Sequence, residues 1–294
     1  MFCKLFGISR QAYYKFQSKL DRQQIQHPII LDLVKVQRRI QPRSGTKKVY
    51  IKIKPELNKI GIKFGRDKLF KLLREENQLV RKRKNFTKTT QSYHRFKKYG
   101  NLICNLEKTH PEQVWVSDIT YIRTKNGFLY LSLITDAYSK QIMGFELSDN
   151  LKASSSVRAL KQAISNRKYH DSKLIHHSDR GFQYCSPEYI KVLDDNEIDI
   201  SMTTKYDPYE NAIAERVNGI LKSEFYMDQT FTNQKEAMRE IKKTIMIYNT
   251  IRLHMSCNYL TPKEAHKKAN YKLKTWSRKF SSKAMALDEK TSYI

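Results

Sequence analysis

The segment VWVSDITYI, residues 114–122, decides the fold class of this chain. It is rich in β-branched and aromatic residues, as strands are, yet it carries Asp118 at its centre. Burying a carboxylate inside an apolar strand is costly unless the carboxylate binds a cation or is paired. We therefore predict a site that depends on Asp118, although an edge strand with its aspartate in water would give the same pattern.

Strand and helix patterns alternate from residue 111 to about residue 270. After two more predicted strands at 128–137 and 141–148, the chain alternates between helices at about 153–168, 187–196, 210–226 and 233–252, strands at 173–177 and 199–203, and a short helix after Pro262. Three meandering strands followed by this alternation is the order of a ribonuclease-H-like α/β fold. We expect a mixed five-stranded sheet with flanking helices, preceded by a small basic helical region.

Two further carboxylates fall on elements that this fold brings near Asp118. Asp179 follows the predicted strand at 173–177, and Glu215 lies on the predicted helix at 210–226. Carboxylates that converge from strand ends and a facing helix can hold two divalent cations for phosphodiester cleavage. A turn or cap role for Asp179 and a solvated position for Glu215 remain open, because the spacing of these residues carries little weight by itself.

The predicted helix around Glu215 has one polar face. Asn211, Glu215, Asn218 and Lys222 are spaced by four, three and four residues, which places them along one side of a helix. Apolar residues occupy the other side and would pack on the sheet. Lys222 lies two turns, about 10 Å, beyond Glu215 on this face, where it could meet a DNA phosphate.

Longer stretches around these residues resemble a known family. The run from Tyr206 through NAIAERVNGILKSE and the segments WVSDITYI, HHSDRGFQYCSPEY, YNTIRLHMSCNYLTP and GISRQAYYK are similar to second-frame (OrfB-type) transposases of the IS-three insertion-sequence family, within the retroviral-integrase superfamily. The resemblance is specific over about 111–266 and looser over 1–110. The 35 residues between Asp179 and Glu215 match the family's spacing.

The resemblance implies a DDE transposase, whose integrase catalytic core cleaves element-end DNA and joins the 3′-hydroxyl to another phosphodiester. Asp118, Asp179 and Glu215 would be the catalytic residues and the ligands of two Mg²⁺ or Mn²⁺ ions. No zinc is expected, because the N-terminal His/Cys module of retroviral integrases is missing. The predicted DNA contacts are Lys222, Asn211, Asn218, Arg180, Arg10, Lys82 and Arg83.

The positive charge is concentrated in the first third of the chain. The 294 residues carry a formal net charge of +27, with 28 Lys and Arg against 7 Asp and Glu in 1–110. Basic residues interleaved with Tyr and Phe favour a nucleic-acid partner, because each neutralised phosphate releases counterions. We predict a helix–turn–helix-like DNA-binding region at 1–80, a basic linker at 81–110, the catalytic core at 111–270 and a polar tail at 271–294. A solvated or membrane-surface basic patch remains the alternative.

Local signals subdivide the basic region. Ser9 is expected to cap a short helix, and a second amphipathic helix is predicted over 67–78. Pro55 is expected to interrupt the first helix of the helix–turn–helix.

The cysteine spacing and the hydropathy of the sequence indicate in which cell compartment the protein is expected. The four cysteines are scattered without a CxxC pair, which argues against disulfides and a cysteine zinc site. No segment is apolar enough to cross a membrane, and the start has no secretory signal. We expect a bacterial cytoplasmic protein, associated with the nucleoid when bound to DNA. Its expected partners are double-stranded DNA (terminal repeats and target), further copies of itself on paired ends, and an upstream first-frame protein.

Three other functions stay open at this point. A metal-dependent nuclease of the same fold would use the same carboxylates. A non-catalytic DNA-binding regulator derived from the element would use 1–110 alone. A tyrosine recombinase would pair His177 and Arg180 with Tyr206 or Tyr209, but it leaves the carboxylates without a role.

Two further pairs of residues have more than one possible role. His176 and His177 precede Asp179, and one of them is expected to lie behind the site or to contact DNA, because a hard cation prefers oxygen ligands. Arg252 and His254 could contact DNA, but bracing the core is the favoured role.

Overall fold

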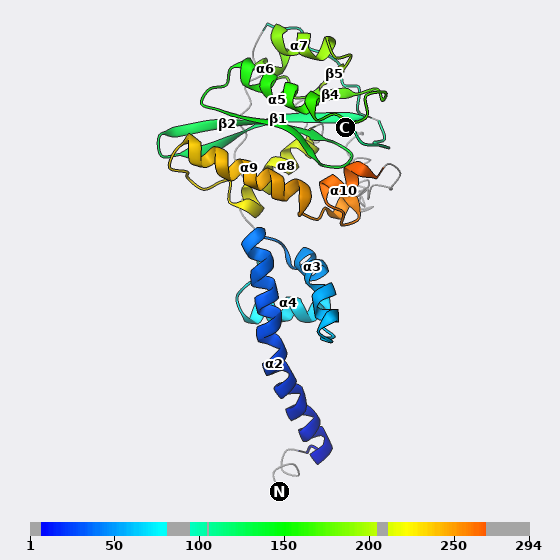
Figure 1. The fold of residues 1–294 in the computed structure, drawn as a ribbon, viewed down its shortest axis with the longest axis vertical. Coiled ribbons are helices and arrows are strands. Elements are labelled where there is room, and N and C mark those ends of the chain that lie inside the picture. Colours follow the sequence, from blue (N-terminus) through cyan, green and yellow to red (C-terminus); the bar gives the residue numbers. More distant parts are fainter. Residues whose placement is uncertain (1–6, 81–94, 105, 205–210, 269–294) are drawn as a thin grey trace, which may run out of the picture.

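The computed structural model describes residues 7–80, 95–104, 106–204 and 211–268, which form a helical unit followed by an α/β core (Figure 1). The helical unit consists of α2 (Arg10–Ile40), α3 (Thr46–Lys59) and α4 (Arg66–Glu75). The strands of the core are β1 (Val114–Thr124), β2 (Gly127–Asp136), β3 (Ile142–Ser148), β4 (Ile175–Ser178) and β5 (Asp199–Met202). Its helices are α5 (Ala153–Ser165), α6 (Phe182–Cys185), α7 (Pro187–Asp194), α8 (Ala212–Phe225), α9 (Gln234–Thr250), the 3-10 turn η1 (Met255–Cys257) and α10 (Pro262–Lys267).

The five strands form one mixed sheet in the order β3-β2-β1-β4-β5. β1 pairs antiparallel with β2, and β2 with β3, whereas β4 runs parallel to both β1 and β5. β1 therefore lies at the centre of the sheet, with Asp118 opposite Leu133 of β2. This topology confirms the predicted ribonuclease-H-like sheet and rules out an edge position for the strand that carries Asp118.

Helices cover both faces of the sheet. On one face α5, α6 and α7 enclose an apolar cluster that includes Trp115, Leu160 and Tyr189 (Figure 1). On the other face α8 and α9 pack over a cluster that includes Leu131, Val217 and Ile245. These two layers account for the continuous apolar character of the central strands, which are buried from both sides.

The predicted core elements are present, although some of their ends are shifted, and the core contains one further helix. β1 continues to Thr124, two residues beyond the expected end, and β4 begins at Ile175. The single turn α6 was not predicted. It begins after Gly181, and it ends where Ser186 caps the next helix by accepting a hydrogen bond from the backbone N–H of Tyr189. A four-residue turn is too short to produce a helical periodicity.

The first helix is much longer than predicted. Ser9 does cap it, since its hydroxyl accepts a hydrogen bond from the backbone N–H of Ala12 at 3.1 Å. However, α2 runs for 31 residues and passes through Pro28, so the expectation of a short helix was wrong. Ile30 and Val34, just after the proline, are fully buried in the helical unit, and this packing offsets the cost of the missing backbone hydrogen bond.

The expected interruption at Pro55 was also wrong. α3 includes Pro55 and buries Val49, Ile53 and Leu57, which are four residues apart along one face. The helix ends instead at Gly61, which adopts a φ of +71°. There the N–H of Ile62 donates to the carbonyl of Leu57, a bond typical of a glycine-terminated helix. The predicted helix at 67–78 is α4, which ends at Glu75.

Part of the predicted linker and the whole predicted tail fall outside the described residues. Residues 95–104 and 106–110 contain neither helix nor strand. Within the described ranges, no helix combines the length and the apolar character that a membrane span requires.

Candidate active site

Asp118 projects from the middle of the central strand and is held in place by two hydrogen bonds. Its Oδ2 accepts a bond from the side-chain amide of Asn218 at 2.8 Å. Its Oδ1 accepts one from the backbone N–H of Ile119 at 2.9 Å. The side chain is only partly exposed, so these bonds fix the direction of the carboxylate as well as satisfying it.

Asp179 follows β4 directly, and β4 is the parallel neighbour of β1. Its Oδ1 accepts a hydrogen bond from the backbone N–H of Gly181 at 3.0 Å. A Cβ on Gly181 would lie 3.0 Å from this same oxygen and 2.8 Å from Oε1 of Gln183. A side chain at position 181 would therefore press on the ends of the Asp179 and Gln183 side chains, which would have to move.

Glu215 lies in the first turn of α8, and two asparagines on either side of it attach this helix to β1. Asn211 donates from its side chain to the carbonyl of Ser117 at 3.0 Å, and Asn218 donates to Asp118. Both asparagines are buried, with 7% and 6% exposure, whereas Glu215 is exposed. The helix is thus fixed with the glutamate carboxylate free to face solvent beside β1.

The three carboxylates influence one another electrostatically. Burial raises the pKa of Asp118, and the negative charges of Asp179 and Glu215 raise it further, to about 7. The hydrogen bonds from Asn218 and Ile119 act in the opposite direction and are outweighed. Three clustered negative charges with hard oxygen donors form an environment that a divalent cation would stabilise.

The carboxylates are near one another without forming a closed ligand cage. Among the described residues, no three His, Cys, Asp or Glu side chains are grouped closely enough to hold a metal ion as they stand. The donors that fit a hard cation are Asp118, Asp179 and Glu215, because all of them are oxygen ligands and the like-charge repulsion at Asp118 would be relieved by binding.

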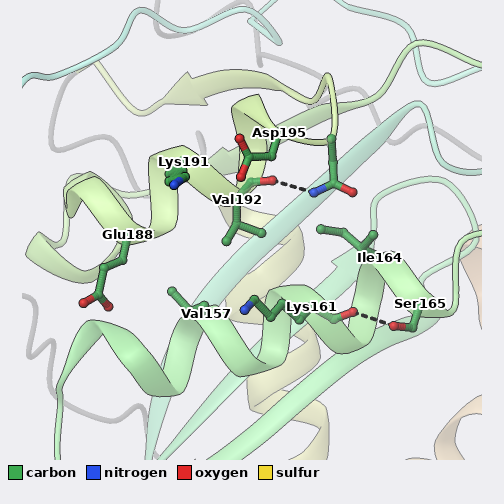
Figure 2. A pocket seen from close by; sticks show the side chains of 9 residues that line it. Val157, Lys161, Ile164, Ser165, Glu188, Lys191, Val192 and Asp195 are labelled. Carbon is green, nitrogen blue, oxygen red and sulfur yellow. Dashed lines mark hydrogen bonds between the residues drawn. The ribbon is translucent and has the colours of Figure 1, made fainter.

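The described pocket lies elsewhere. It is a hollow of about 640 Å³ between α5 and α7, lined by side chains such as Val157, Lys161 and Lys191 (Figure 2). None of the three carboxylates lines it. The candidate site is therefore separate from this hollow.

Comparisons with known proteins assign the chain to a family. Two family models, each described as an integrase core domain, match residues 108–208 and 196–262. The 31 kDa protein of insertion element IS600 from Shigella sonnei is 33% identical over 88% of this chain and 95% of its own length. The transposase InsF of insertion sequence IS3A from Escherichia coli is 34% identical over 54% of this chain and 55% of its own. The chain belongs to the IS3 family of insertion-sequence transposases.

Other relatives extend the comparison. The transposase of IS904 from Lactococcus lactis is 37% identical over 57% of this chain and 66% of its own length. The chain therefore spans between half and two thirds of the length of the IS904 and IS3A transposases, and nearly the whole length of the IS600 protein. A solved structure of the HTLV-2 integrase catalytic core domain in complex with magnesium is 20% identical, with a TM-score of 0.44, over 54% of this chain and 99% of that one.

Family membership favours a transposase over the other functions that the sequence left open. The transposase is a polynucleotidyl-transferase type of enzyme, and its family depends on divalent metal ions. The tyrosine-recombinase alternative is wrong, because the family is defined by the integrase core. His177, which that alternative needed at the surface, is fully buried, and Tyr206 and Tyr209 lie outside the described residues.

The two histidines before Asp179 form a layer beneath the site. His176 Nε2 lies 2.6 Å from Oγ of Ser117 and 2.9 Å from the hydroxyl of Tyr189. Burial, followed by the charge of His177, lowers the pKa of His176 to about 3, so this ring is neutral. Both histidines are at most 1% exposed, so the expected position behind the site is confirmed and a DNA contact is excluded in this conformation.

Tyr184 is a residue near the site that the sequence did not single out. Its side chain is 3% exposed, and its hydroxyl has no hydrogen-bond partner among the described residues. Burial raises its pKa, and so do the charges of Asp179 and Asp118, which places the ring close to both carboxylates. In the sequence, only the position of Tyr184 one turn after Gly181, within HHSDRGFQY, could have indicated that it lies near the carboxylates.

The predicted DNA contacts fall into three groups. Lys222 and Arg180 are partly buried beside the carboxylates. Burial lowers the pKa of Lys222, and the negative charge of Asp118 offsets part of this effect. Arg10 is exposed at the far end of α2 from the sheet (Figure 1). Lys82 and Arg83 lie outside the described residues.

The two asparagines predicted to contact DNA have a different position. Asn211 and Asn218 are buried, and their amide N–H groups bond Ser117 and Asp118. The sequence placed them correctly on the face of Glu215, but the two asparagines on that face pack against β1, whereas Glu215 is exposed. In this conformation both side chains attach α8 to the strand.

Arg252 and His254 brace the core, as the sequence favoured. Arg252 is 2% exposed and makes two hydrogen bonds to Glu224, at 2.9 and 2.7 Å. His254 is 6% exposed and stacks edge-on against Tyr248. Neither side chain is available to DNA in this conformation.

Proposed function

We propose that this transposase cleaves the DNA at the ends of its insertion element and joins the freed 3′-hydroxyl to a second phosphodiester, using Asp118, Asp179 and Glu215 as its catalytic residues. The observation that carries the proposal is the hydrogen bond between Asn218 and Asp118. It attaches the helix of Glu215 to the strand of Asp118, and β4 holds Asp179 beside that strand.

The three carboxylates are proposed as ligands for two Mg²⁺ or Mn²⁺ ions. When bound, such ions would activate an attacking oxygen and stabilise charge on the leaving oxygen. The raised pKa of Asp118 supports this role, because a group held near other negative charges gains most from a cation. Glu215 is exposed on a fixed helix, and its side chain is proposed to turn towards the two aspartates when the ions bind.

The other residues of the site would position the reactants. Lys222 is proposed to contact the phosphate next to the cleaved bond. It lies partly buried on α8, close enough to Asp118 for the negative charge of that carboxylate to act on its pKa. Asn211 and Asn218 would keep the orientation of α8 constant while DNA binds. Ser117, His176 and Tyr189 form a neutral hydrogen-bonded layer that supports β1 from behind.

The partners proposed for the transposase follow from its family and its charge. Residues 1–110 would bind the terminal repeats, and the core would bind the target duplex. Paired ends require at least two copies of the chain, so a homo-oligomer is proposed on DNA. A first-frame protein encoded upstream is proposed as a further partner, and the cytoplasm, at the nucleoid, as the place of action.

One experiment tests this function. The purified chain is mixed with Mg²⁺ and a labelled duplex of the adjoining element end, and the products are separated by length. Both a shortened strand and longer, joined strands are expected. Shortened strands without joined ones would identify a nuclease, and binding with neither product would identify a DNA-binding regulator.

A further inference from the structure

The helical unit and the core have separate apolar interiors. One cluster contains Ile30, Val34, Ile53, Leu69 and Leu73 with their neighbours, all of them from α2, α3, α4 and the adjoining turns. The remaining clusters contain only residues from the linker and the core. Among the described residues, no apolar cluster combines side chains from the two parts, whereas several polar contacts join them.

The carboxylate of Glu224 is the centre of these polar contacts. Each of its oxygens accepts bonds from both the helical unit and the core, and Nζ of Lys48 reaches both oxygens, with 3.2 Å to Oε2. Oε1 is 2.9 Å from Nζ of Lys48 and 2.7 Å from the guanidinium of Arg252. Oε2 is 2.7 Å from the side-chain amide of Gln41 and 2.9 Å from Nε of Arg252.

The contacts of Gln41, Lys48 and Arg252 with Glu224 form a polar joint between the helical unit and the core, and a backbone hydrogen bond reinforces this joint. The N–H of Arg43, in the loop between α2 and α3, donates to the carbonyl of Glu224 at 3.1 Å. The guanidinium of Arg43 lies over the ring of Tyr226, with 4.9 Å to its centroid. The loop that joins α2 and α3 is thereby fixed to the last turn of α8.

The joint differs from an ordinary surface ion pair. The side chains of Glu224 and Lys48 are 15% and 17% exposed, and that of Arg252 is 3% exposed. In the exposed pair of Lys59 and Glu56 on α3, these values are 69% and 53%. Exposed pairs add little stability, whereas removing one partner of a buried pair leaves an uncompensated charge. Loss of one of these partners would therefore disturb the structure more than loss of an exposed pair.

Glu224 belongs to the same helix as Glu215. The two glutamates are nine residues apart on α8, about 14 Å along the helix axis. We propose that Glu224 is a positioning residue, which holds the DNA-binding helical unit in one orientation to the catalytic helix so that the element end meets the carboxylates in a single register. This inference rests on the proposed function.

The variants that test this joint leave the core's own contacts in place. Lys48→Met and Gln41→Leu remove the bonds that these side chains make to Glu224 and keep both bonds between Arg252 and Glu224. Lys48→Arg retains the charge and is expected to behave as the wild type. Lys59→Met is the matched control, since it removes one positive charge from the same helix at an exposed pair.

The first measurement is independent of activity. In a chain in which Cys3 and Cys104 are replaced by serine, spin labels are attached after Lys71→Cys on α4 and Arg239→Cys on α9, both exposed positions. Their distance distribution is measured by pulsed electron resonance. One narrow distribution is expected for the wild type, Lys48→Arg and Lys59→Met, and a broad one for Lys48→Met and Gln41→Leu. Unchanged distributions in the last two variants would overturn the proposal.

The second measurement follows the cut on the labelled element-end duplex. Because small misplacements of reacting groups are costly, cleavage at the main position should fall about 10- to 100-fold in Lys48→Met and Gln41→Leu, with cuts at neighbouring positions. The DNA affinity of Lys48→Met should equal that of Lys59→Met, and the DNA affinity of Gln41→Leu should equal that of the wild type. Wild-type position and rate in both variants would contradict the proposal. If even the wild type cuts no DNA, the proposed function fails, and the distance distributions alone decide the role of the joint.

Discussion

The side-chain amide of Asn218 donates a hydrogen bond to Oδ2 of Asp118 across 2.8 Å, which ties the helix of one proposed catalytic carboxylate to the strand of another. The bond joins residues 100 positions apart in the sequence. It also favours the ionised form of Asp118, against burial and against the charges of Asp179 and Glu215.

Replacing Asn218 should therefore weaken the site without unfolding the protein. In Asn218→Ala, the pKa of Asp118 is expected to rise above the wild-type value of about 7, so that Mg²⁺ binds more weakly at neutral pH and cleavage shifts to higher pH. The pH dependence of single-turnover cleavage measures this. A profile that coincides with the wild type would show that the bond does not act on Asp118.

Lys222 is expected to contribute one phosphate contact. Lys222→Ala should weaken binding of cut ends and reduce the slope of log affinity against log salt by about 1. Fluorescence anisotropy at several salt concentrations gives the slope. Lys161→Ala, on α5 at the opposite face of the sheet, is the control and should leave the slope unchanged. Equal slopes in the wild type and Lys222→Ala would remove Lys222 from the DNA interface.

The pH dependence of stability should report on His266. Burial alone would lower its pKa, but the carboxylates of Asp136 and Glu112 raise it to about 9. Nε2 of His266 lies 3.0 Å from Glu112. Since the unfolded value is about 6.5, the stabilisation, on the order of 3 kcal/mol, is complete below about pH 6.5 and is lost as pH rises through about 9.

Urea unfolding at pH 7 and pH 10 tests this expectation. The free energy of unfolding of the wild type should fall more between these pH values than that of His266→Gln. His170→Gln, at an exposed histidine, should follow the wild type. Parallel pH dependence in the wild type and His266→Gln would show that this histidine is not charged in the folded protein.

Gly144 on β3 should tolerate no side chain. A Cβ there would collide with the carbonyl oxygen of Ala159 and would lie 2.7 Å from the backbone nitrogen of Ala163, both on α5. Gly144→Ala is therefore expected to cost about 1–3 kcal/mol of unfolding free energy, measured by urea titration. Gly219→Ala on α8 is the control. No atom lies within 4 Å of its added Cβ, so alanine should be neutral or stabilising. A stable Gly144→Ala protein would contradict the close packing of α5 on the sheet.

The sequence predicted the sheet because β1, β2 and β3 are long, apolar and separated by clear turns, and because the short strands β4 and β5 alternate with helical patterns. It placed Asp118, Asp179 and Glu215 on the elements that carry them, because these elements have strong periodicities. Their detailed arrangement depends on contacts distant in sequence. The burial of Asn218 and Asn211 against β1 could not be inferred from a polar stripe, because a stripe does not say which neighbour it faces.

The helical unit was harder to predict for a related reason. Pro28 and Pro55 are strong local signals for a helix end, yet the burial of residues such as Ile30 and Ile53 outweighs them. Tertiary packing of this kind has no local signature. The same holds for the joint at Glu224, whose partners Gln41, Lys48 and Arg252 come from three separate segments.

The most direct test of the proposed catalytic site is the substitution Glu215→Gln, which keeps the shape of an exposed side chain and removes its charge. Single-turnover cleavage and joining of the labelled element-end duplex are measured with Mg²⁺, beside DNA affinity and beside Glu188→Gln, an exposed glutamate of α7, as the control. Glu215→Gln should bind DNA as the wild type does and form neither product, while Glu188→Gln remains active. Cleavage by Glu215→Gln at the wild-type rate would contradict the assignment of the three carboxylates.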